Sequence, residues 1–252
     1  LVDLPKNVQL AQVVPDYDQP MDLPGYTEVK PLATDGEIEA IARLIAESRR
    51  PVIYAGGGVV LSDAALELLE LVKKTGIPVT TTLTGLGGFP GDHPLALDML
   101  GMHGSVYANL AVSEADLLLA FGVRFDDRVT GKVSEFAKHG KIVHVDIDAS
   151  EINKIRSTDL ASVSDVKYAL GELNKRVKRP AEIGTWAKRI DAWKKADPFK
   201  YDEDAESVLP QHAIHELWRL TKDRDTIVAT GVGQHQMWAA QFYRFAKPRT
   251  WL

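Results

Sequence analysis

Apolar residues recur every three or four positions in two early segments of the chain. In the first segment, Thr34 and Glu37 form the capping-box pair that begins a helix, and the helical pattern continues to Arg49. In the second, residues 64–74 are amphipathic and Gly76 follows, a residue type that commonly closes a helix. We therefore expect two amphipathic helices here.

Short, continuously apolar runs separate the helical segments. Such strands are typical of a parallel sheet buried on both faces, and their alternation with helices is typical of an α/β fold. We therefore predict a doubly wound parallel sheet. The expected strands occupy residues 51–55, 77–81, 116–121 and 142–147, and further helices occupy residues 105–114, 150–154 and 166–177.

The two ends of the chain depart from this pattern. Residues 1–5 have the composition of a strand already under way, and residues 9–31 are rich in Pro, Asp and Gln without a period. Beyond the sheet, residues 186–195 predict some helix within a linker that reaches Pro210. The last part of the chain predicts a helix, a strand and a helix, at residues 211–220, 226–230 and 236–245.

Both ends look cut, so we expect a piece of a longer protein that contains parts of several domains. The expected division is the end of one domain with a linker at 1–30, a central α/β domain at 31–180, a second linker at 181–210, and the start of a further domain at 211–252.

Three consecutive glycines, Gly56 to Gly58, follow the first expected strand and precede a helix. Without side chains, their backbone can approach a phosphate or a ribityl chain closely. As a dinucleotide fingerprint the segment is imperfect, because Leu61 occupies the third glycine position and the next strand ends in Thr81 and Thr82 instead of an acid. These departures argue against ordinary NAD binding, and a tight turn without a ligand is the alternative.

Four expected strands end in unusual residues. In open α/β sheets, ligands lie outside the carboxyl ends of the strands, where arginines can meet a pyrophosphate and a carboxylate can accept from ribose hydroxyls. We therefore predict a dinucleotide along this edge; the alternative is that the arginines and aspartates only neutralise one another in a loop. The four ends are the glycine triplet, residues 81–88, residues 122–128 (GVRFDDR), and Asp146 with Asp148.

The segment MLGMHG, residues 99–104, lies between two of these strand ends. Its glycines flank Met102 and His103, which we expect on exposed, irregular backbone where a ring system can pack. Because no acid or second histidine stands at ligand spacing, we predict no metal site there.

Composition narrows the function further. The net charge of -5 and the lack of long basic runs argue against nucleic acid as a partner. The chain has no cysteine, which excludes disulfides and thiolate nucleophiles and favours an intracellular compartment. No apolar stretch approaches the roughly 20 residues that cross a bilayer, so we expect no membrane association.

Taken in order, several strings along almost the whole chain resemble the large catalytic subunit of acetohydroxyacid synthase, a thiamine diphosphate-dependent carboligase. Related enzymes such as pyruvate oxidase and glyoxylate carboligase share the domain plan, but FGVRFDDRVTGK and GVGQHQMWAAQ are similar to the synthase in particular. The other strings are VDLPK, PVIYAGGG, GIPVTTTLTGLG, MLGMHG, VYANLAV and KIVHVDID.

The resemblance implies three consecutive α/β domains, of which the first binds the thiamine pyrimidine, the central one binds extended flavin adenine dinucleotide (FAD), and the third binds thiamine diphosphate. One departure from the family pattern is Thr84, where an apolar residue such as Met is common, so a hydroxyl replaces thioether packing against the flavin. The flavin contacts that the resemblance implies are Gly57, Thr82, Leu83, Thr84, Leu100, Gly101, Met102, His103, Gly122, Arg124, Asp126, Asp146, Ile147, Asp165 and Val166.

The reaction that the resemblance implies is decarboxylation of pyruvate on thiamine diphosphate, followed by addition to a second 2-keto acid (pyruvate or 2-ketobutyrate) in branched-chain amino-acid biosynthesis. Arg128 is expected to hold the carboxylate of the acceptor, because a guanidinium suits that geometry. Lys6, Met102, His103 and Asp127 are expected around the same channel, and Val232, Gly233, Gln234 and His235 at the diphosphate of thiamine.

The family's activating glutamate on the first domain, and its GDG and NN magnesium signature on the third, are both missing. We therefore expect the ligands of Mg²⁺ outside this chain, and we expect the chain alone to bind flavin at most and to be inactive. By resemblance we also expect a homo-oligomer, either a dimer or a tetramer, a possible regulatory subunit, and a bacterial cytoplasm, with an organelle left open. The alternatives are a free-standing nucleotide-binding module and a flavin-dependent pyruvate oxidase.

Overall fold

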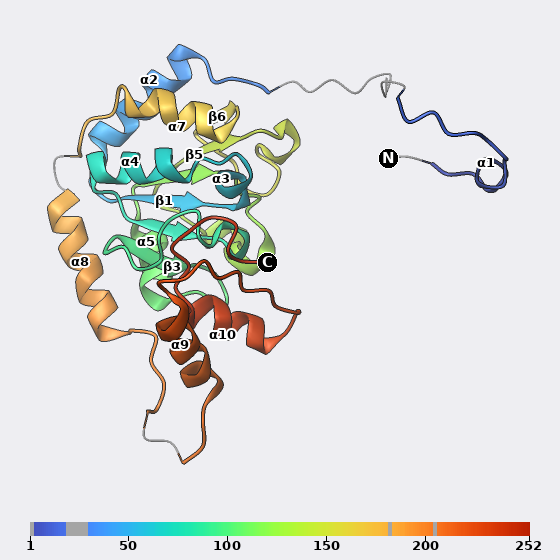
Figure 1. Cartoon of the computed structure of the whole chain (residues 1–252). Helices are drawn as coiled ribbons and strands as arrows, with labels where there is room; N and C mark the ends of the chain where they lie inside the picture. Colours follow the sequence, from blue (N-terminus) through green and yellow to red (C-terminus); the bar gives the residue numbers. More distant parts are fainter. Residues whose placement is uncertain (1–2, 19–29, 181–182, 204–205) are drawn as a thin grey trace.

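The computed structural model describes residues 3–18, 30–180, 183–203 and 206–252. The first two residues of the strand expected at 1–5 lie outside this range, and residues 3–5 form no strand. A short helix, α1 (Lys6–Gln9), follows instead, and its side chains are exposed. Part of the connecting segment expected at 9–31 also lies outside the described residues. Figure 1 shows α1 apart from the α/β body.

Six parallel strands form one sheet in the order β3-β2-β1-β4-β5-β6. The prediction of a parallel α/β fold is therefore confirmed. The strands β1 and β4 are in the middle and buried along their whole length, as expected for continuously apolar runs. The bounds are β1 (Pro51–Ala55), β2 (Val79–Thr81), β3 (Ala96–Met99), β4 (Leu117–Phe121), β5 (Lys141–Asp146) and β6 (Leu160–Val163).

Helices flank the sheet on both sides (Figure 1). On one side, α2 (Asp35–Glu47) and α4 (Ala65–Thr75) pack against α7 (Val166–Asn174), and on the other, α5 (Val106–Glu114) packs against α8 (Ile183–Ala196). The expected starting and stopping signals are confirmed. Thr34 and Glu37 form a reciprocal capping box before α2, and Gly76, with φ of 74°, closes α4.

Several short elements were not expected from the sequence. The glycine triplet continues into a helix, α3 (Gly57–Leu61), and the arginine-aspartate segment contains α6 (Asp127–Thr130). The helix expected at 150–154 is only a 3₁₀ turn, η3 (Ala149–Glu151). Two further 3₁₀ turns are η1 (Leu83–Gly85) and η2 (Val133–Glu135).

The two edge strands were also missed, for an identifiable reason. In β3, Asp98 interrupts the apolar run, adopts a positive φ of 57° and coincides with a register shift against β2. In β6, the polar residue Ser162 also interrupts the apolar run. A polar residue in a strand of four removes most of the periodic signal, so neither strand is visible in the apolar pattern.

The segment expected to be a linker contains a helix that is part of the main core. Ile183, Trp186 and Ile190 of α8 are each at most 3% exposed, and the indole Nε1 of Trp186 donates to the carbonyl oxygen of Pro51 over 3.0 Å. The division of the chain into domains stays a prediction.

The C-terminal part contains the two expected helices, α9 (Pro210–Thr221) and α10 (Gln234–Phe242), which pack against each other. The strand expected at 226–230 is wrong: only one bridge forms there, between Val228 and Trp251. This segment is tied to the loop after β2, because the N–H of Gly91 donates to the carbonyl oxygen of Phe245 over 2.9 Å.

Candidate cofactor-binding edge

Two glycines bring the ends of the central strands into direct contact. The N–H of Gly56 donates to Phe121 and that of Gly58 to Gly122, over 3.0 and 3.1 Å. A Cβ on Gly58 would lie 2.5 Å from the Cα of Gly122, which has a φ of 60°. A side chain at either position would force the two strand ends apart, so this crossing requires glycine.

The residues after β2 lie beside the same crossing. The N–H of Thr82 donates to the carbonyl oxygen of Ala55 over 3.0 Å, and the Thr82 hydroxyl accepts from the N–H of Gly85. The hydroxyl oxygens of Thr82 and Thr84 are 3.2 Å apart, and a Cβ on Gly57 would lie 2.9 Å from the hydroxyl oxygen of Thr84. Gly57, Thr82, Leu83 and Thr84 are therefore neighbours, and their contact with a flavin stays a prediction.

In the loop that follows β4, inward and outward residues alternate. Val123 and Phe125 are each 2% exposed, whereas Arg124 is exposed and Asp126 half-buried. Phe125 has a φ of 52°, a conformation that costs a bulky residue about 1–3 kcal/mol and persists only where packing holds it. The carboxylate of Asp126 accepts from the N–H of Arg128 over 3.1 Å and so begins α6. The loop thus presents a guanidinium and a carboxylate outward.

The end of β5 lies next to this loop. The N–H of Gly122 donates to the carbonyl oxygen of Val145 over 2.9 Å. Asp146 is buried and accepts from the N–H of Asp148 over 2.9 Å, whereas Ile147 is 49% exposed. A hydrogen bond from Ser150 lowers the pKa of the exposed Asp148 carboxyl.

Asp165 and Val166, the two remaining residues expected along the edge, follow β6. The N–H of Ser164 donates to the carbonyl oxygen of Asp146 over 2.9 Å, which places the next residue, Asp165, beside the end of β5. Asp165 also begins α7, because its carboxylate accepts from the N–H of Tyr168. Val166 is 3% exposed, so its side chain belongs to the core.

The loop after β3 is held in place by Asn109 of α5. The side-chain oxygen of Asn109 accepts from the N–H of Gly101 over 2.9 Å, and its amide donates to the carbonyl oxygens of Gly101 and Ser105 over 3.1 Å each. Leu100 is buried, whereas Met102 is 64% exposed, and His103 is also exposed.

Hydrogen bonds join this loop to its neighbours on both sides. The N–H of Met102 donates to the carbonyl oxygen of Arg128 over 2.9 Å, and Gln241 of α10 donates to that of His103 over 2.9 Å. Asp127 and Arg128 are both exposed. Met102, His103, Asp127 and Arg128 therefore lie on two joined, exposed segments, and their role in a substrate channel stays a prediction.

Two expected parts of the site are not brought to it. Lys6 lies on α1, apart from the α/β body (Figure 1). Val232 to His235 precede or begin α10 and are exposed, and no hydrogen bond or ion pair within the described part of the chain joins them to the strand ends.

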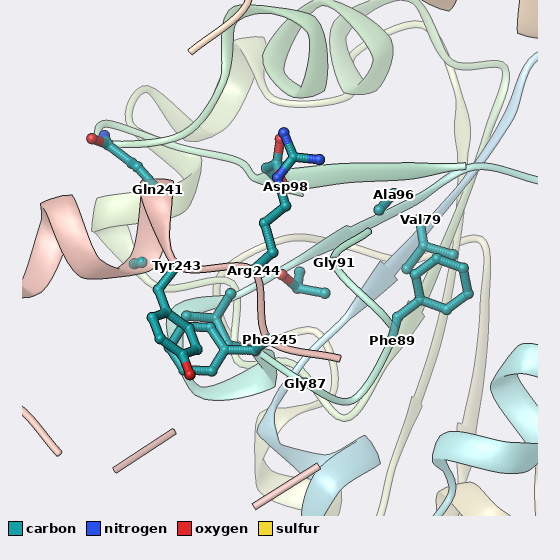
Figure 2. A pocket seen from close by; sticks show the side chains of 13 residues that line it. Val79, Gly87, Phe89, Gly91, Ala96, Asp98, Gln241, Tyr243, Arg244 and Phe245 are labelled. Carbon is teal, nitrogen blue, oxygen red and sulfur yellow. The ribbon is translucent and has the colours of Figure 1, made fainter. Parts of the chain in front are cut away.

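Two cavities of the described part of the chain lie elsewhere, along the edge of the sheet at β3. Figure 2 shows a small pocket between β2, β3 and the C-terminal segment, in which Arg244 extends toward Asp98. A neighbouring groove of about 380 Å³ is also lined by Tyr107 and Lys194. None of the residues expected to bind a cofactor lines either space.

Three polar side chains of this groove, Asp98, Tyr107 and Lys194, form hydrogen bonds within the fold. The hydroxyl of Tyr107 donates to the carboxylate of Asp98, and the ammonium of Lys194 donates to the carbonyl oxygens of Pro94 and Ala96. Burial raises the pKa of the Asp98 carboxyl and lowers that of the Lys194 ammonium. Lys194 thereby satisfies an edge strand that would otherwise expose its backbone.

Among the residues that shape the edge, Asn109, Phe125 and His144 were not expected from the sequence. The ring nitrogen Nε2 of His144, which is fully buried on β5, lies 2.9 Å from the carbonyl oxygen of Val123. A polar residue inside an apolar strand is the one signal that could have found His144. Nothing in the sequence marks Asn109, because it lies within a helical pattern.

Two negative findings apply to the described part of the chain. No group of three or more His, Cys, Asp or Glu side chains there is arranged to hold a metal ion. No helix there is both long enough and apolar enough to cross a membrane.

A parallel sheet whose glycine-rich strand ends meet at one edge defines a class of cofactor-binding α/β domains. Residues 38–173 match the family described as "Thiamine pyrophosphate enzyme, central domain", and the chain belongs to this family. Similar proteins include plant acetolactate synthases. The chain is 53% identical to acetolactate synthase 2, chloroplastic, of Zea mays, over 100% of this chain and 40% of that protein. It is 50% identical to acetolactate synthase, chloroplastic, of Arabidopsis thaliana, over 100% of this chain and 38% of that protein.

These matches bear on three of the expectations. The resemblance to the acetohydroxyacid (acetolactate) synthase family is confirmed, and the pyruvate oxidase and the free-standing module are not favoured. The chain spans about 40% of the length of these relatives. The expectation of a bacterial cytoplasm is wrong, because the matched relatives are chloroplastic and point to an organelle.

Proposed function

We propose that this chain is the flavin-holding central part of an acetolactate synthase located in an organelle. In this proposal FAD extends across the carboxyl ends of β2, β1, β4 and β5. The whole protein then joins pyruvate to a second 2-keto acid, with thiamine diphosphate and Mg²⁺. The observation that carries the proposal is the close Gly58–Gly122 crossing of the segments after β1 and β4, at the edge where β2 and β5 of the parallel sheet also end and where Arg124 is exposed.

The residues at this edge suit a dinucleotide in three respects. The half-exposed glycines after β1 leave open backbone beside Thr82 and Thr84, where a chain of hydroxyls or phosphates can approach. Arg124 has no hydrogen-bond or ion-pair partner among the described residues, so it is available to a pyrophosphate. The carboxylates of Asp126 and Asp146 can accept from hydroxyl groups. An extended ligand lying over an edge needs no deep cavity.

The second part of the proposal concerns the 2-keto acid. Arg128 is exposed at the start of α6 and is linked through its own carbonyl oxygen to Met102, next to His103. A planar guanidinium can hold a carboxylate through two parallel hydrogen bonds. We assign Arg128 the carboxylate of the acceptor, with Met102, His103 and Asp127 around it.

The remaining catalytic parts need groups from outside this chain. Thiamine diphosphate supplies the carbanion chemistry when bound, and Val232 to His235 would meet its diphosphate with exposed main-chain and side-chain donors. Lys6 would reach the channel only when neighbouring domains are in place. A homo-oligomer and a regulatory subunit are further parts of this proposal, and the isolated chain is inactive in it.

The flavin part is tested by titrating the purified chain with FAD and following flavin absorbance and fluorescence. The expected result is saturable binding that Arg124→Ala weakens about tenfold, since a charge-assisted hydrogen bond is lost. Arg43→Ala is the matched control, because Arg43 is an exposed arginine on α2, away from the strand ends. If the unaltered chain binds no FAD, or if both variants bind equally well, the flavin assignment is wrong.

The substrate part needs the chain within the whole enzyme. There, Arg128→Ala should raise KM for the 2-keto acid by about a hundredfold, and Arg128→Lys should recover only part of the loss because it lacks the planar fork. Steady-state kinetics at varied 2-keto acid concentration distinguish a rise in KM from a change in kcat alone. An unchanged KM in both variants would assign the carboxylate to another group.

A further inference from the structure

Four rings lie together beneath the loop after β4. They belong to Tyr54, Phe125, Phe136 and His144, and we call this group the aromatic clamp. The ring of Phe125 lies 5.7 Å from Tyr54, 6.0 Å from Phe136 and 5.0 Å from His144, each in an edge-on arrangement. All four side chains are at most 8% exposed. Phe125 therefore contacts every other member of the clamp.

The register of the sheet creates the space for Phe125. Tyr54 on β1 pairs with Ala120 on β4, and Ala120 pairs with His144 on β5. Residues in register on neighbouring strands point to the same face of a sheet, so a small alanine separates two larger rings. The ring of Phe125 lies between Tyr54 and His144, which explains how a bulky residue keeps a φ of 52°.

His144 adds a directional contact to this packing. Its Nε2 lies 2.9 Å from the carbonyl oxygen of Val123 and 3.8 Å from a carboxylate oxygen of Asp146. Because a carbonyl oxygen only accepts, Nε2 carries the hydrogen and donates it to Val123. The other ring nitrogen, Nδ1, has no hydrogen-bond partner among the described residues. His144 thus contacts two consecutive inward-facing positions of the loop, Val123 and Phe125.

We propose that His144 is the positioning residue of the cofactor edge: by fixing Val123 and Phe125 it turns Arg124 and Asp126 outward, toward the dinucleotide. His144 touches no cofactor itself and acts through the backbone of the loop. The inference rests on the proposed flavin site, and it adds the group that makes this loop rigid before the ligand arrives. A loop fixed in its binding conformation loses less entropy on binding.

Two substitutions separate the hydrogen bond from the ring. His144→Phe keeps a ring for Phe125 but cannot donate to Val123, whereas His144→Gln can place a donor near the Nε2 position but lacks the ring. Thr80→Val is the matched control for a buried polar contact, because Thr80 is fully buried on β2 of the same sheet and donates to the carbonyl oxygen of Asp98 over 2.8 Å.

The measurements are FAD affinity by fluorescence titration and thermal stability of the ligand-free chain. We expect His144→Phe to weaken FAD binding about tenfold and His144→Gln to recover part of that loss, while Thr80→Val lowers Tm without changing FAD affinity. FAD affinity of His144→Phe within a factor of two of the unaltered chain would overturn the proposal. So would an affinity loss in Thr80→Val equal to that in His144→Phe, because the effect would then follow stability.

Amide hydrogen exchange tests the clamp without flavin. We expect the amides of residues 123–128 to exchange faster in His144→Phe than in the unaltered chain or Thr80→Val, because the loop opens locally. Faster exchange in His144→Phe, together with an unaltered chain that fails to bind FAD, would refute the flavin site and leave the clamp supported. Unchanged exchange in His144→Phe would refute the clamp even where FAD binds.

Discussion

The N–H of Met102 donates to the carbonyl oxygen of Arg128 over 2.9 Å, and this bond joins the loop after β3 to the first turn of α6. The two segments lie on different strand ends and are more than twenty residues apart in the chain. Because the bond is between backbone groups, it holds the backbones of Met102 and Arg128 together in every rotamer of their side chains. The loop after β3 and the start of α6, which form the mouth of the proposed channel, are therefore joined through their backbones.

Gly101 should be required for this junction. It has a φ of 92°, and a Cβ there would lie 2.5 Å from the carbonyl oxygen of Arg128. We expect Gly101→Ala to reduce the free energy of unfolding by about 1–3 kcal/mol, through backbone strain and the displaced Arg128 carbonyl. Urea unfolding followed by circular dichroism measures the change.

Gly36→Ala is the matched control. Gly36 lies on α2 with no atom within 4 Å of an added Cβ. Alanine is favoured over glycine in a helix, so this variant should be as stable as the unaltered chain or slightly more stable. Equal effects of the two substitutions would show that Gly101 holds no special conformation.

Asn109 should stabilise the loop after β3. Its side chain makes three hydrogen bonds, two with Gly101 and one with Ser105. In Asn109→Ala the N–H and carbonyl groups of the loop lose these partners, so we expect a loss of about 1–3 kcal/mol in urea unfolding. The exposed Asn7 on α1 is the control, and Asn7→Ala should leave stability unchanged. A loss of stability in Asn109→Ala no larger than that in Asn7→Ala would show that other groups hold the loop.

The central part of the fold was predictable because its strands are apolar throughout. β1 and β4 are buried along their whole length, so burial on both faces leaves a continuous apolar run. β3 was not predictable because Asp98, a charged residue, sits in the strand at a positive φ and is accommodated by Tyr107. That compensation is a tertiary contact which no local pattern contains.

The sequence predicted which residues follow the strands at the candidate edge, but it did not predict which residues hold these loops in place. Gly122 and Arg124 follow an apolar strand, so the rule for open α/β sheets places them at the edge. The roles of Asn109 and His144 depend on which loop residues they meet, Gly101 and Val123, which lie 8 and 21 residues away in the sequence. The hydrogen bonds of Asn109 and His144 form only when helix α5 and strand β5 have packed against these loops.

The helix α8 should be part of the cooperative core. Ile190 is 3% exposed and lies in the main cluster of buried apolar residues. Ile190→Ala should therefore cost about 2–5 kcal/mol, through lost burial and the cavity that remains. Leu66→Ala is the control, because Leu66 on α4 is 77% exposed and its truncation leaves no cavity. A small effect of Ile190→Ala on global unfolding would mean that α8 detaches before the sheet unfolds.

The last prediction concerns the pH dependence of stability at β3. Burial raises the folded-state pKa of the Asp98 carboxyl above 3.8, and this outweighs the hydrogen bond from Tyr107 and the attraction of Arg244 and Lys194, which lower it. A carboxyl with a raised folded pKa binds its proton more tightly in the folded state than in the unfolded state. Its ionisation therefore opposes folding, and stability falls as the pH rises through the window that begins near the unfolded value.

Asp98→Asn removes this titration and keeps an oxygen that can accept from Tyr107. The stability of Asp98→Asn relative to the unaltered chain should increase as the pH rises from near 3.8 through the raised folded-state pKa of Asp98, and become constant above it. Urea unfolding at several pH values in this range measures the difference. Asp92→Asn, which removes an exposed carboxylate in the same groove, is the control for the loss of a charge there. A relative stability of Asp98→Asn that does not vary with pH would mean that Asp98 is ionised in the folded protein throughout this range.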